Sequence, residues 1–317
     1  RYDVIVSQPS HPWTAGASHL YTREFLATAK EHLQEDGVFL QWMNIDFLNV
    51  DLFRSLGATL LSEFRYVRLY MPNRTALFFL GSDQPLEVES QLHAADVPLH
   101  GFIDSVRPLG ISGLNDVASS LVLDTEELAA ICEGAPLTTD NRNRLAFGAT
   151  PRAAEETVEA IRAVLAEHDA LVHHRDRLFA GRGVPLNLAI IARRISYTDQ
   201  WDRAQRISES IDDPAEAAVV RAIVAREAGN LAAAREHARA AVAANPLHAE
   251  AAWLLTDLYA DELASGHADP ELLRLASSMP DPQRALFEAS LLLPRDDFVG
   301  LQRLEPRLAQ GTPGHLG

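Results

Sequence analysis

The sequence predicts an α/β unit followed by an all-helical unit. Over residues 1–150, short runs rich in Val, Ile, Phe and Leu alternate with segments of helical periodicity, which is typical of a sheet covered by helices. Over residues 151–317 the strand signals vanish, and Ala-rich helical periodicity with many Glu and Arg residues dominates. We therefore expect two domains, with a boundary near residue 150.

The first half is expected to run strand, helix, strand, helix, strand, strand. The apolar run 3–7 is typical of a buried strand, and the run 38–42 is typical of a second one. The helix between them is predicted to end at Asp36-Gly37, because glycine is favoured just past a helix C-terminus. Its apolar face comprises Leu20, Phe25, Leu26, Ala29 and Leu33.

A second helix and a hairpin complete the predicted sheet. Asn49 is placed to cap a helix with the apolar residues Leu52, Phe53, Leu56 and Leu60. The strands 66–71 and 75–80 are joined across Pro72-Asn73, so they must pair antiparallel, and we expect this hairpin at the edge of the sheet. The earlier strands are joined through helices and are expected to be parallel.

Composition excludes several classes of partner. The 317 residues are 47% apolar, which is enough for packed cores, and the net charge of −16 offers no positive surface for nucleic acid or anionic lipid. No apolar run approaches the roughly 20 residues that a membrane helix needs. The one cysteine, Cys132, is expected to be a small buried residue of a cytoplasmic protein. The adjacent His173 and His174 point to different helix faces, so no metal site is predicted.

Several short motifs in the first half can be compared with a known family. They are Gln8-Pro9-Ser10-His11-Pro12-Trp13 after the first strand, Ala15-Gly16, Leu20-Tyr21-Thr22 with Glu24-Phe25, Gly37-Val38-Phe39 followed by Gln41-Trp42, and Thr139-Asp140-Asn141. Together they resemble the spermidine synthase-like (polyamine aminopropyltransferase) family over about residues 1–150. The resemblance is greatest to bacterial members that are fused to membrane or repeat segments.

The resemblance implies the C-terminal half of a class I methyltransferase-like, Rossmann-like sheet. It also implies transfer of an aminopropyl group to a small amine or polyamine, with decarboxylated S-adenosylmethionine or S-adenosylmethionine as the donor. The Gly-rich turn and the acidic residue with which the family binds its donor have no counterpart in this sequence. We therefore expect donor-binding strands before residue 1, where the fused relatives suggest a membrane tether, and a chain that is inactive alone.

The catalytic positions implied by the resemblance depart from the family pattern. Open α/β sheets bind ligands beyond the carboxyl ends of their strands, which is where Gln8 and His11 are expected. The transfer needs a base that takes a proton from the acceptor amine, and Gln8 stands where the family has an acidic residue. An amide cannot accept that proton. His11 could substitute as the base, because histidine titrates near neutral pH; alternatively it is a turn residue beside Pro12.

The remaining predicted site residues would bind the substrate. By resemblance the acceptor faces Ser10, Trp13 and Gln41. Trp42 could stack on a ligand or simply pack at the rim of the sheet. Asp140 lies near the active-site rim by resemblance, although aspartate before a strand is also an ordinary turn former.

The second half contains an internal repeat. A 34-residue unit that begins at Ala215 places Gly229 in a turn, Pro246 near its end, and small residues at the packing positions Ala234, Ala238 and Ala241. The next unit begins at Ala249 and has Leu255 and Tyr259 as its large packing residues. A shifted unit runs over 185–211, and the Pro-rich tail 280–317 is typical of a worn cap. This pattern resembles tetratricopeptide repeats.

Two functions follow from these patterns. The first is a spermidine synthase-like transferase, and the second is a noncatalytic interaction scaffold that combines a degenerate synthase domain with tetratricopeptide-like repeats. A repeat stack can bind a peptide or protein partner, here with the arginines Arg221, Arg226, Arg235 and Arg239. Alternatively the stack is an appendage that covers the enzyme half.

Overall fold

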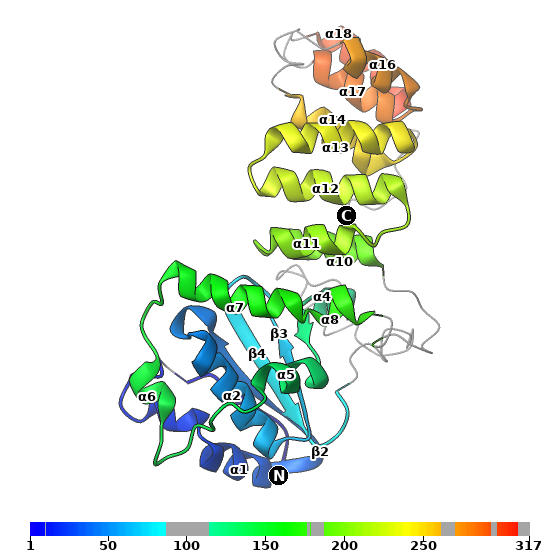
Figure 1. Cartoon of the computed structure of the whole chain (residues 1–317). Coiled ribbons are helices and arrows are strands. Elements are labelled where there is room, and N and C mark those ends of the chain that lie inside the picture. Colours follow the sequence, from blue (N-terminus) through cyan, green and yellow to red (C-terminus); the bar gives the residue numbers. More distant parts are fainter. Residues whose placement is uncertain are drawn as a thin grey trace. The chain divides into compact units, whose positions relative to one another are not determined.

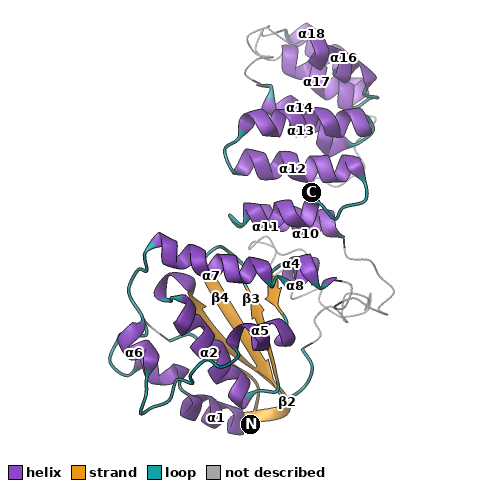
Figure 2. Cartoon of the chain, in the orientation of Figure 1, coloured by secondary structure: helices purple, strands orange, loops and turns teal. Residues whose placement is uncertain are grey.

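The computed structural model describes residues 1–9, 11–86, 114–175, 178, 187–260, 270–292 and 297–309. The chain divides into two compact units, Arg1–Asn187 and Leu188–Gly317. The first is mixed α/β with an open five-stranded sheet, and the second is helical (Figures 1 and 2). Among the described residues, no helix is both long enough and apolar enough to cross a membrane.

The sheet of the first unit has the strand order β1-β2-β4-β3-β5. Its strands are β1 (Tyr2–Ser7), β2 (Leu33–Asn44), β3 (Tyr66–Tyr70), β4 (Ala76–Ser82) and β5 (Leu121–Leu123). The predicted parallel pairing of the first two strands is confirmed, with Val4 opposite Val38 and Ser7 opposite Gln41. The predicted antiparallel hairpin is also confirmed, since β3 pairs antiparallel with β4.

The hairpin does not lie at the edge, as the sequence led us to expect. β4 pairs with β2 on one side, and the outer side of β3 pairs with the three-residue β5. The reason is that β5 comes from much later in the chain and carries three buried apolar residues, which gain from a place in the sheet. The hairpin thus occupies the interior of the sheet.

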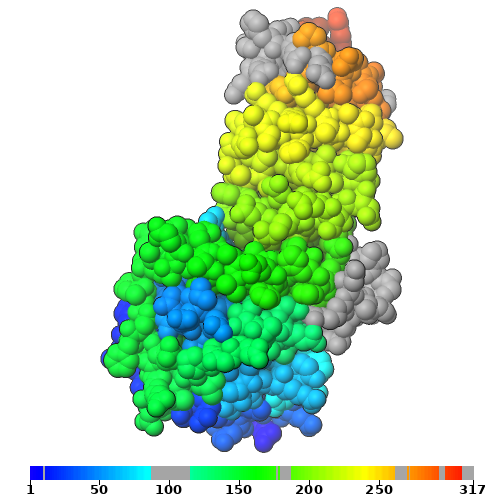
Figure 3. All heavy atoms as spheres, in the orientation of Figure 1, coloured from blue at the N-terminus to red at the C-terminus, as the bar shows by residue number. Residues whose placement is uncertain are grey.

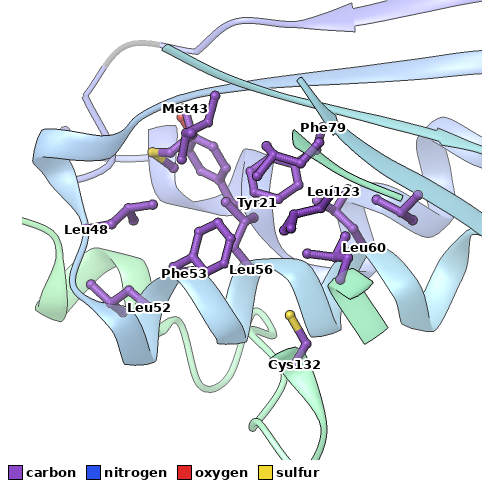
Figure 4. Close-up of a cluster of buried hydrophobic side chains, with 14 of the residues drawn as sticks. Tyr21, Met43, Leu48, Leu52, Phe53, Leu56, Leu60, Phe79, Leu123 and Cys132 are labelled. Carbon is purple, nitrogen blue, oxygen red and sulfur yellow. The ribbon is translucent and has the colours of Figure 1, made fainter. Parts of the chain in front are cut away.

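Helices cover one face of this sheet. They are α1 (Arg23–His32), α2 (Val50–Glu63), α5 (Thr125–Cys132) and α7 (Glu155–Glu167). Phe53, Leu56 and Leu60 of α2 pack with Phe79 and other buried side chains in one apolar core, shown in Figure 4. Asn49 caps α2 as predicted, since its side chain accepts a hydrogen bond from the Leu52 amide at 2.9 Å. In Figure 3, green atoms of the later helices surround the blue atoms of α2.

The first helix is shorter than predicted. α1 ends at His32, and β2 already begins at Leu33, which lies opposite Tyr2. Asp36-Gly37 therefore lies in an irregular part of β2 where the register shifts by several residues. A Cβ on Gly37 would lie 3.1 Å from the backbone N and O of Gln34. The close approach of the backbone in this bulge therefore favours glycine at position 37.

β1 is not the buried strand that its apolar sequence predicts. Tyr2, Val4 and Val6 are 61%, 58% and 61% exposed. They project from the sheet face opposite to the helical core, because their neighbours Ile5 and Ser7 are the residues that turn inward. Within the described residues β1 pairs only with β2, so this strand has an open edge as well as an exposed apolar face.

The boundary between the units lies at Asn187, later than the change of pattern near residue 150. The reason is that α7, although purely helical in pattern, buries Val158, Ile161 and Leu165 in the core of the first unit. Figure 1 shows α7 in green alongside the sheet. α8 (Ala170–His173) follows it in the same unit.

The second unit is a series of packed helices. They are α10 (Leu188–Ser196), α11 (Trp201–Ser208), α12 (Pro214–Glu227), α13 (Leu231–Ala244), α14 (Ala249–Leu258), α16 (Pro270–Ser278), α17 (Gln283–Leu292) and α18 (Phe298–Ala309). Gly229 has φ +77° in the turn between α12 and α13, as the repeat predicts. The predicted packing residues are all buried: Ala234, Ala238, Ala241, Leu255 and Tyr259. The tail that is predicted to be a worn cap contains α17 and α18.

A glycine in α2 sets the distance between two helices. A Cβ added to Gly57 would lie 2.5 Å from the sulfur of Cys132, which is buried in α5 as predicted. We expect Gly57→Ala to lower the free energy of unfolding, because overpacking costs about 1–3 kcal/mol while alanine regains about 1 kcal/mol of helix propensity. Urea unfolding of the 317-residue chain measures the difference.

The control for this prediction is Gly57→Ala in a Cys132→Ala background, in which the neighbouring side chain is smaller. With Cys132→Ala in place the sulfur is gone and the closest remaining contact is Leu128 Cδ1 at 3.1 Å, at the end of a flexible side chain. Adding Gly57→Ala should then raise the unfolding free energy by up to about 1 kcal/mol relative to Cys132→Ala alone. A stabilising effect of Gly57→Ala in the presence of Cys132 would show that the helices are free to separate.

Candidate functional site

The candidate site lies where the parallel strands β1 and β2 end. Gln8 follows the last residue of β1 and is exposed, and Ser10 lies outside the described residues. His11 is exposed within the next turn, in which its carbonyl accepts a hydrogen bond from the Thr14 amide at 2.9 Å. Parallel strands present their carboxyl ends at one rim of the sheet, so residues that follow β1 and β2 come together there.

Four aromatic side chains form a cluster at this rim. The rings of His11 and Trp13 stack with centroids 4.8 Å apart. Phe47 lies 5.5 Å from His11 and meets Trp13 edge to face at 4.9 Å. Trp42 completes the cluster with its ring 6.1 Å from that of Phe47. The structure therefore brings together three of the predicted site residues, which come from both strand ends.

Phe47 is the centre of this aromatic cluster, and the sequence analysis missed it. It lies in a short 3-10 turn (Ile45–Phe47) that follows β2 directly and is only 8% exposed. Asn44 caps this turn by accepting a hydrogen bond from the Asp46 amide at 2.8 Å. The available signal was an aromatic residue just past the second strand, at the rim where ligands of open sheets bind.

A later segment of the chain holds the turn in place. The Phe47 carbonyl accepts a hydrogen bond from the Thr150 amide at 3.3 Å, and the Asp46 carbonyl accepts one from the Ala153 amide at 2.7 Å. The turn is thus fixed on both sides by backbone contacts, since β2 precedes it and residues 150–153 pair with it. A rigid position for Phe47 gives His11 and Trp13 a fixed surface to pack on.

Gln41 is buried inside the sheet and does not line an open rim. β2 continues to Asn44, and the side chain of Gln41 is fully buried. Its amide nitrogen donates to the carbonyl oxygens of Ser7 at 3.3 Å and Trp42 at 3.2 Å, while its Oε1 has no hydrogen-bond partner. Gln41 therefore links the end of β1 to β2 through Nε2, and its Oε1 is a buried hydrogen-bond acceptor without a partner.

Asp140 belongs to a separate polar group around the start of α1. Its carboxylate accepts hydrogen bonds from Thr22 Oγ1 at 2.8 Å and lies 3.0 Å from His19 Nδ1. Its backbone amide donates to Glu24 at 3.0 Å. The hydrogen bonds from His19 and Thr22 lower the pKa of the Asp140 carboxyl. His19 was not predicted, because only the fold brings it to a residue 121 positions later.

The aromatic cluster has the chemistry to hold a cation or a flat group. Indole and phenyl faces attract ammonium groups, and they exclude water from one side of a bound ligand. His11 is the one member that can also accept or donate a proton. Gln8 adds a neutral amide that can orient a polar group but cannot take its proton. Among the described residues no cluster of His, Cys, Asp or Glu is arranged to hold a metal ion.

The pairing of His19 with Asp140 predicts a pH effect that NMR can resolve. His19→Ala should raise the carboxyl pKa of Asp140 toward its ordinary value, as followed by carbon NMR of the carboxylate. Because the folded pKa is below the unfolded one, the stabilisation is complete above the unfolded pKa and is lost as the pH falls through the folded pKa. The stability gap between wild type and variant should therefore close in acid.

A matched histidine serves as the control. His32 is the last residue of α1, whereas His19 lies in the short 3-10 helix Ala17–Tyr21 before it, and His32 contacts the Thr28 carbonyl instead of a carboxylate. His32→Ala should leave the pKa of Asp140 unchanged. An Asp140 pKa that is the same in wild type and His19→Ala would show that the His19 contact does not form in solution.

Comparison with known proteins identifies no relative: no family model matches the chain, and no curated protein matches it.

Proposed function

We propose that the first unit is the acceptor-binding half of a spermidine synthase-like transferase. The observation that carries this proposal is the gathering of His11, Trp13 and Trp42 around Phe47 at the carboxyl ends of two parallel strands. Strand β1 and the turn after it also carry the motif on which the family resemblance rests. The acceptor is a small amine or polyamine, whose ammonium groups suit an aromatic surface.

The reaction moves an aminopropyl group from a sulfonium donor to the amine. The amine lone pair attacks the carbon beside the sulfur, the C–S bond breaks, and its electron pair stays on the sulfur, which becomes a neutral thioether. The attacking nitrogen must also lose a proton to a base. His11 can take that proton, while Gln8 can only orient the amine through its amide oxygen.

The form of the sheet supports a donor site beyond the described strands. β1, which pairs parallel with β2, exposes an apolar face and an open edge, and further strands and helices that buried this apolar surface would stabilise the sheet. Further strands added beside β1, with helices on its exposed face, would give the class I methyltransferase-like sheet of which this unit is the second half. Decarboxylated S-adenosylmethionine would bind to those added strands and present its aminopropyl carbon to the amine held at the rim.

Two substitutions in the full-length protein test the roles of Gln8 and His11. If Gln8 stands in place of a lost base, Gln8→Glu should raise the rate of aminopropyl transfer to a diamine at least tenfold, within the roughly 10²–10⁴-fold range of general base catalysis. Rates are measured by the thioether product released. No increase would remove Gln8 as the reason for low activity.

The pH profile isolates His11. If His11 is the base, kcat/KM should rise with pH through one ionisation, and His11→Ala should remove that dependence. Thr14→Ala changes the same turn without a titrating group and should keep the profile. A profile that survives in His11→Ala would assign the proton transfer to another residue.

A second function is favoured by Gln8 itself. An exposed amide at the base position, in a sequence that has no Gly-rich donor turn, fits a noncatalytic scaffold in which a degenerate synthase domain accompanies the helical repeats. In that case the rim would keep its aromatic packing but bind no donor. The packed helices α10–α14 would then carry the function, through a peptide or protein partner.

A further inference from the structure

A continuous row of charged and aromatic side chains crosses three helices of the second unit. The helices are α10, α12 and α14, the first helices of successive pairs. Arg193 at the end of α10 pairs with Glu216 of α12 at 2.5 Å and with Glu250 of α14 at 2.8 Å. One arginine therefore links all three helices, which fixes their side chains on a common face.

A second arginine repeats this arrangement further along the same helices. Arg226 of α12 lies over the ring of Trp253 of α14, with its guanidinium carbon 5.6 Å from the ring centroid. Its nitrogens lie 2.9 Å from Glu227 and 3.4 Å from Asp257. Tyr197, just past α10, lies one helical turn after Arg193, whose carbonyl accepts a hydrogen bond from the Tyr197 amide at 3.3 Å. We call this surface the ladder face; it consists of Arg193, Tyr197, Glu216, Arg226, Glu227, Glu250, Trp253 and Asp257.

The ladder face exposes two large aromatic rings. Tyr197 is 55% exposed and Trp253 is 47% exposed. Trp253 and Asp257 are one helical turn apart, so they lie on the same side of α14. Tyrosine, tryptophan and arginine are the residues most enriched in the energetic centres of protein interfaces. Their adjacency here, on three helices, gives the face the composition of a docking site.

The charge of the ladder face determines what it attracts. Its four carboxylates, Glu216, Glu227, Glu250 and Asp257, outnumber its arginines, and they still do so when Arg194 on α10 is added. The surroundings have the same sign, since the chain carries 44 acidic against 28 basic residues. The face already holds a guanidinium against an indole ring and two carboxylates, which is the chemistry that recognises a cation.

We propose that the ladder face binds an extended basic peptide. An arginine or lysine of the peptide contacts the exposed part of the Trp253 ring and the carboxylate of Asp257, and an apolar residue packs on Tyr197. This proposal is independent of the transferase reaction, because it uses only the second unit.

The test is fluorescence anisotropy with the 317-residue chain and a labelled ten-residue peptide of alternating arginine and leucine. The matched probe has glutamate in place of every arginine. We expect saturable binding of the arginine peptide that weakens as salt is added, because exposed charge pairs are screened, and no binding of the glutamate peptide. Equal binding of both peptides, or of neither, overturns the proposal.

Variants locate the binding on the ladder face. Trp253→Ala and Asp257→Asn should each weaken binding of the arginine peptide about tenfold, a loss within the range of a partly desolvated cation–π or charge-assisted contact. Glu236→Gln on α13 removes the same charge from an exposed position outside the ladder face and should leave the affinity within about twofold.

A conservative variant separates binding from folding. Trp253→Phe keeps an aromatic ring, so it should retain most of the affinity even if Trp253→Ala lowers the melting temperature. If Glu236→Gln weakens binding as much as Asp257→Asn, the attraction is general to an acidic chain and the ladder face is not a site.

Discussion

The parallel pairing of β1 with β2 is the constraint on which the first unit depends. Parallel strands must be joined by a crossover, and here α1 makes that connection. α1 and α2 pack into the same apolar core, so both lie on one face of the sheet. Two consequences follow directly: the carboxyl ends of β1 and β2 share a rim, and the opposite face of β1 is left exposed.

The rim at the ends of β1 and β2 is packed by its own residues, whereas the exposed face of β1 is not covered by the described residues. The rim is complete in itself, because Phe47 supports His11 and Trp13, and backbone hydrogen bonds from residues 150–153 hold the turn that carries Phe47. The exposed face is incomplete, since Val4 and Val6 present apolar surface that burial would stabilise. In the proposed transferase the rim would be the acceptor surface, and the open edge and exposed face of β1 would adjoin the donor surface.

Local patterns in the sequence predicted the helices, strands and caps well, but they predicted burial and long-range contacts less well. The cap at Asn49 and the packing residues Leu255 and Tyr259 depend on neighbours in the chain, and they were predicted. The exposure of β1 was not predicted, because alternating valines indicate a strand but carry no information on what covers it. Phe47 and His19 were missed for a similar reason: their partners come from other segments, and no periodicity reports such contacts.

The second unit has a separate physical basis. Alanines on α13 and leucines on α14 fill the space between the helices. Arginines form ion pairs that link α10, α12 and α14 at their surface. Helices α12, α13, α14, α16 and α17 of this unit pack against their neighbours in one apolar core. A scaffold role and a transferase role can thus reside in one chain without sharing residues.

The central claim is that the described rim binds the acceptor amine, next to a donor that binds beside β1. Calorimetric titration of the full-length protein with decarboxylated S-adenosylmethionine tests it most directly. We predict micromolar binding. Absence of binding would contradict the claim and favour the noncatalytic scaffold.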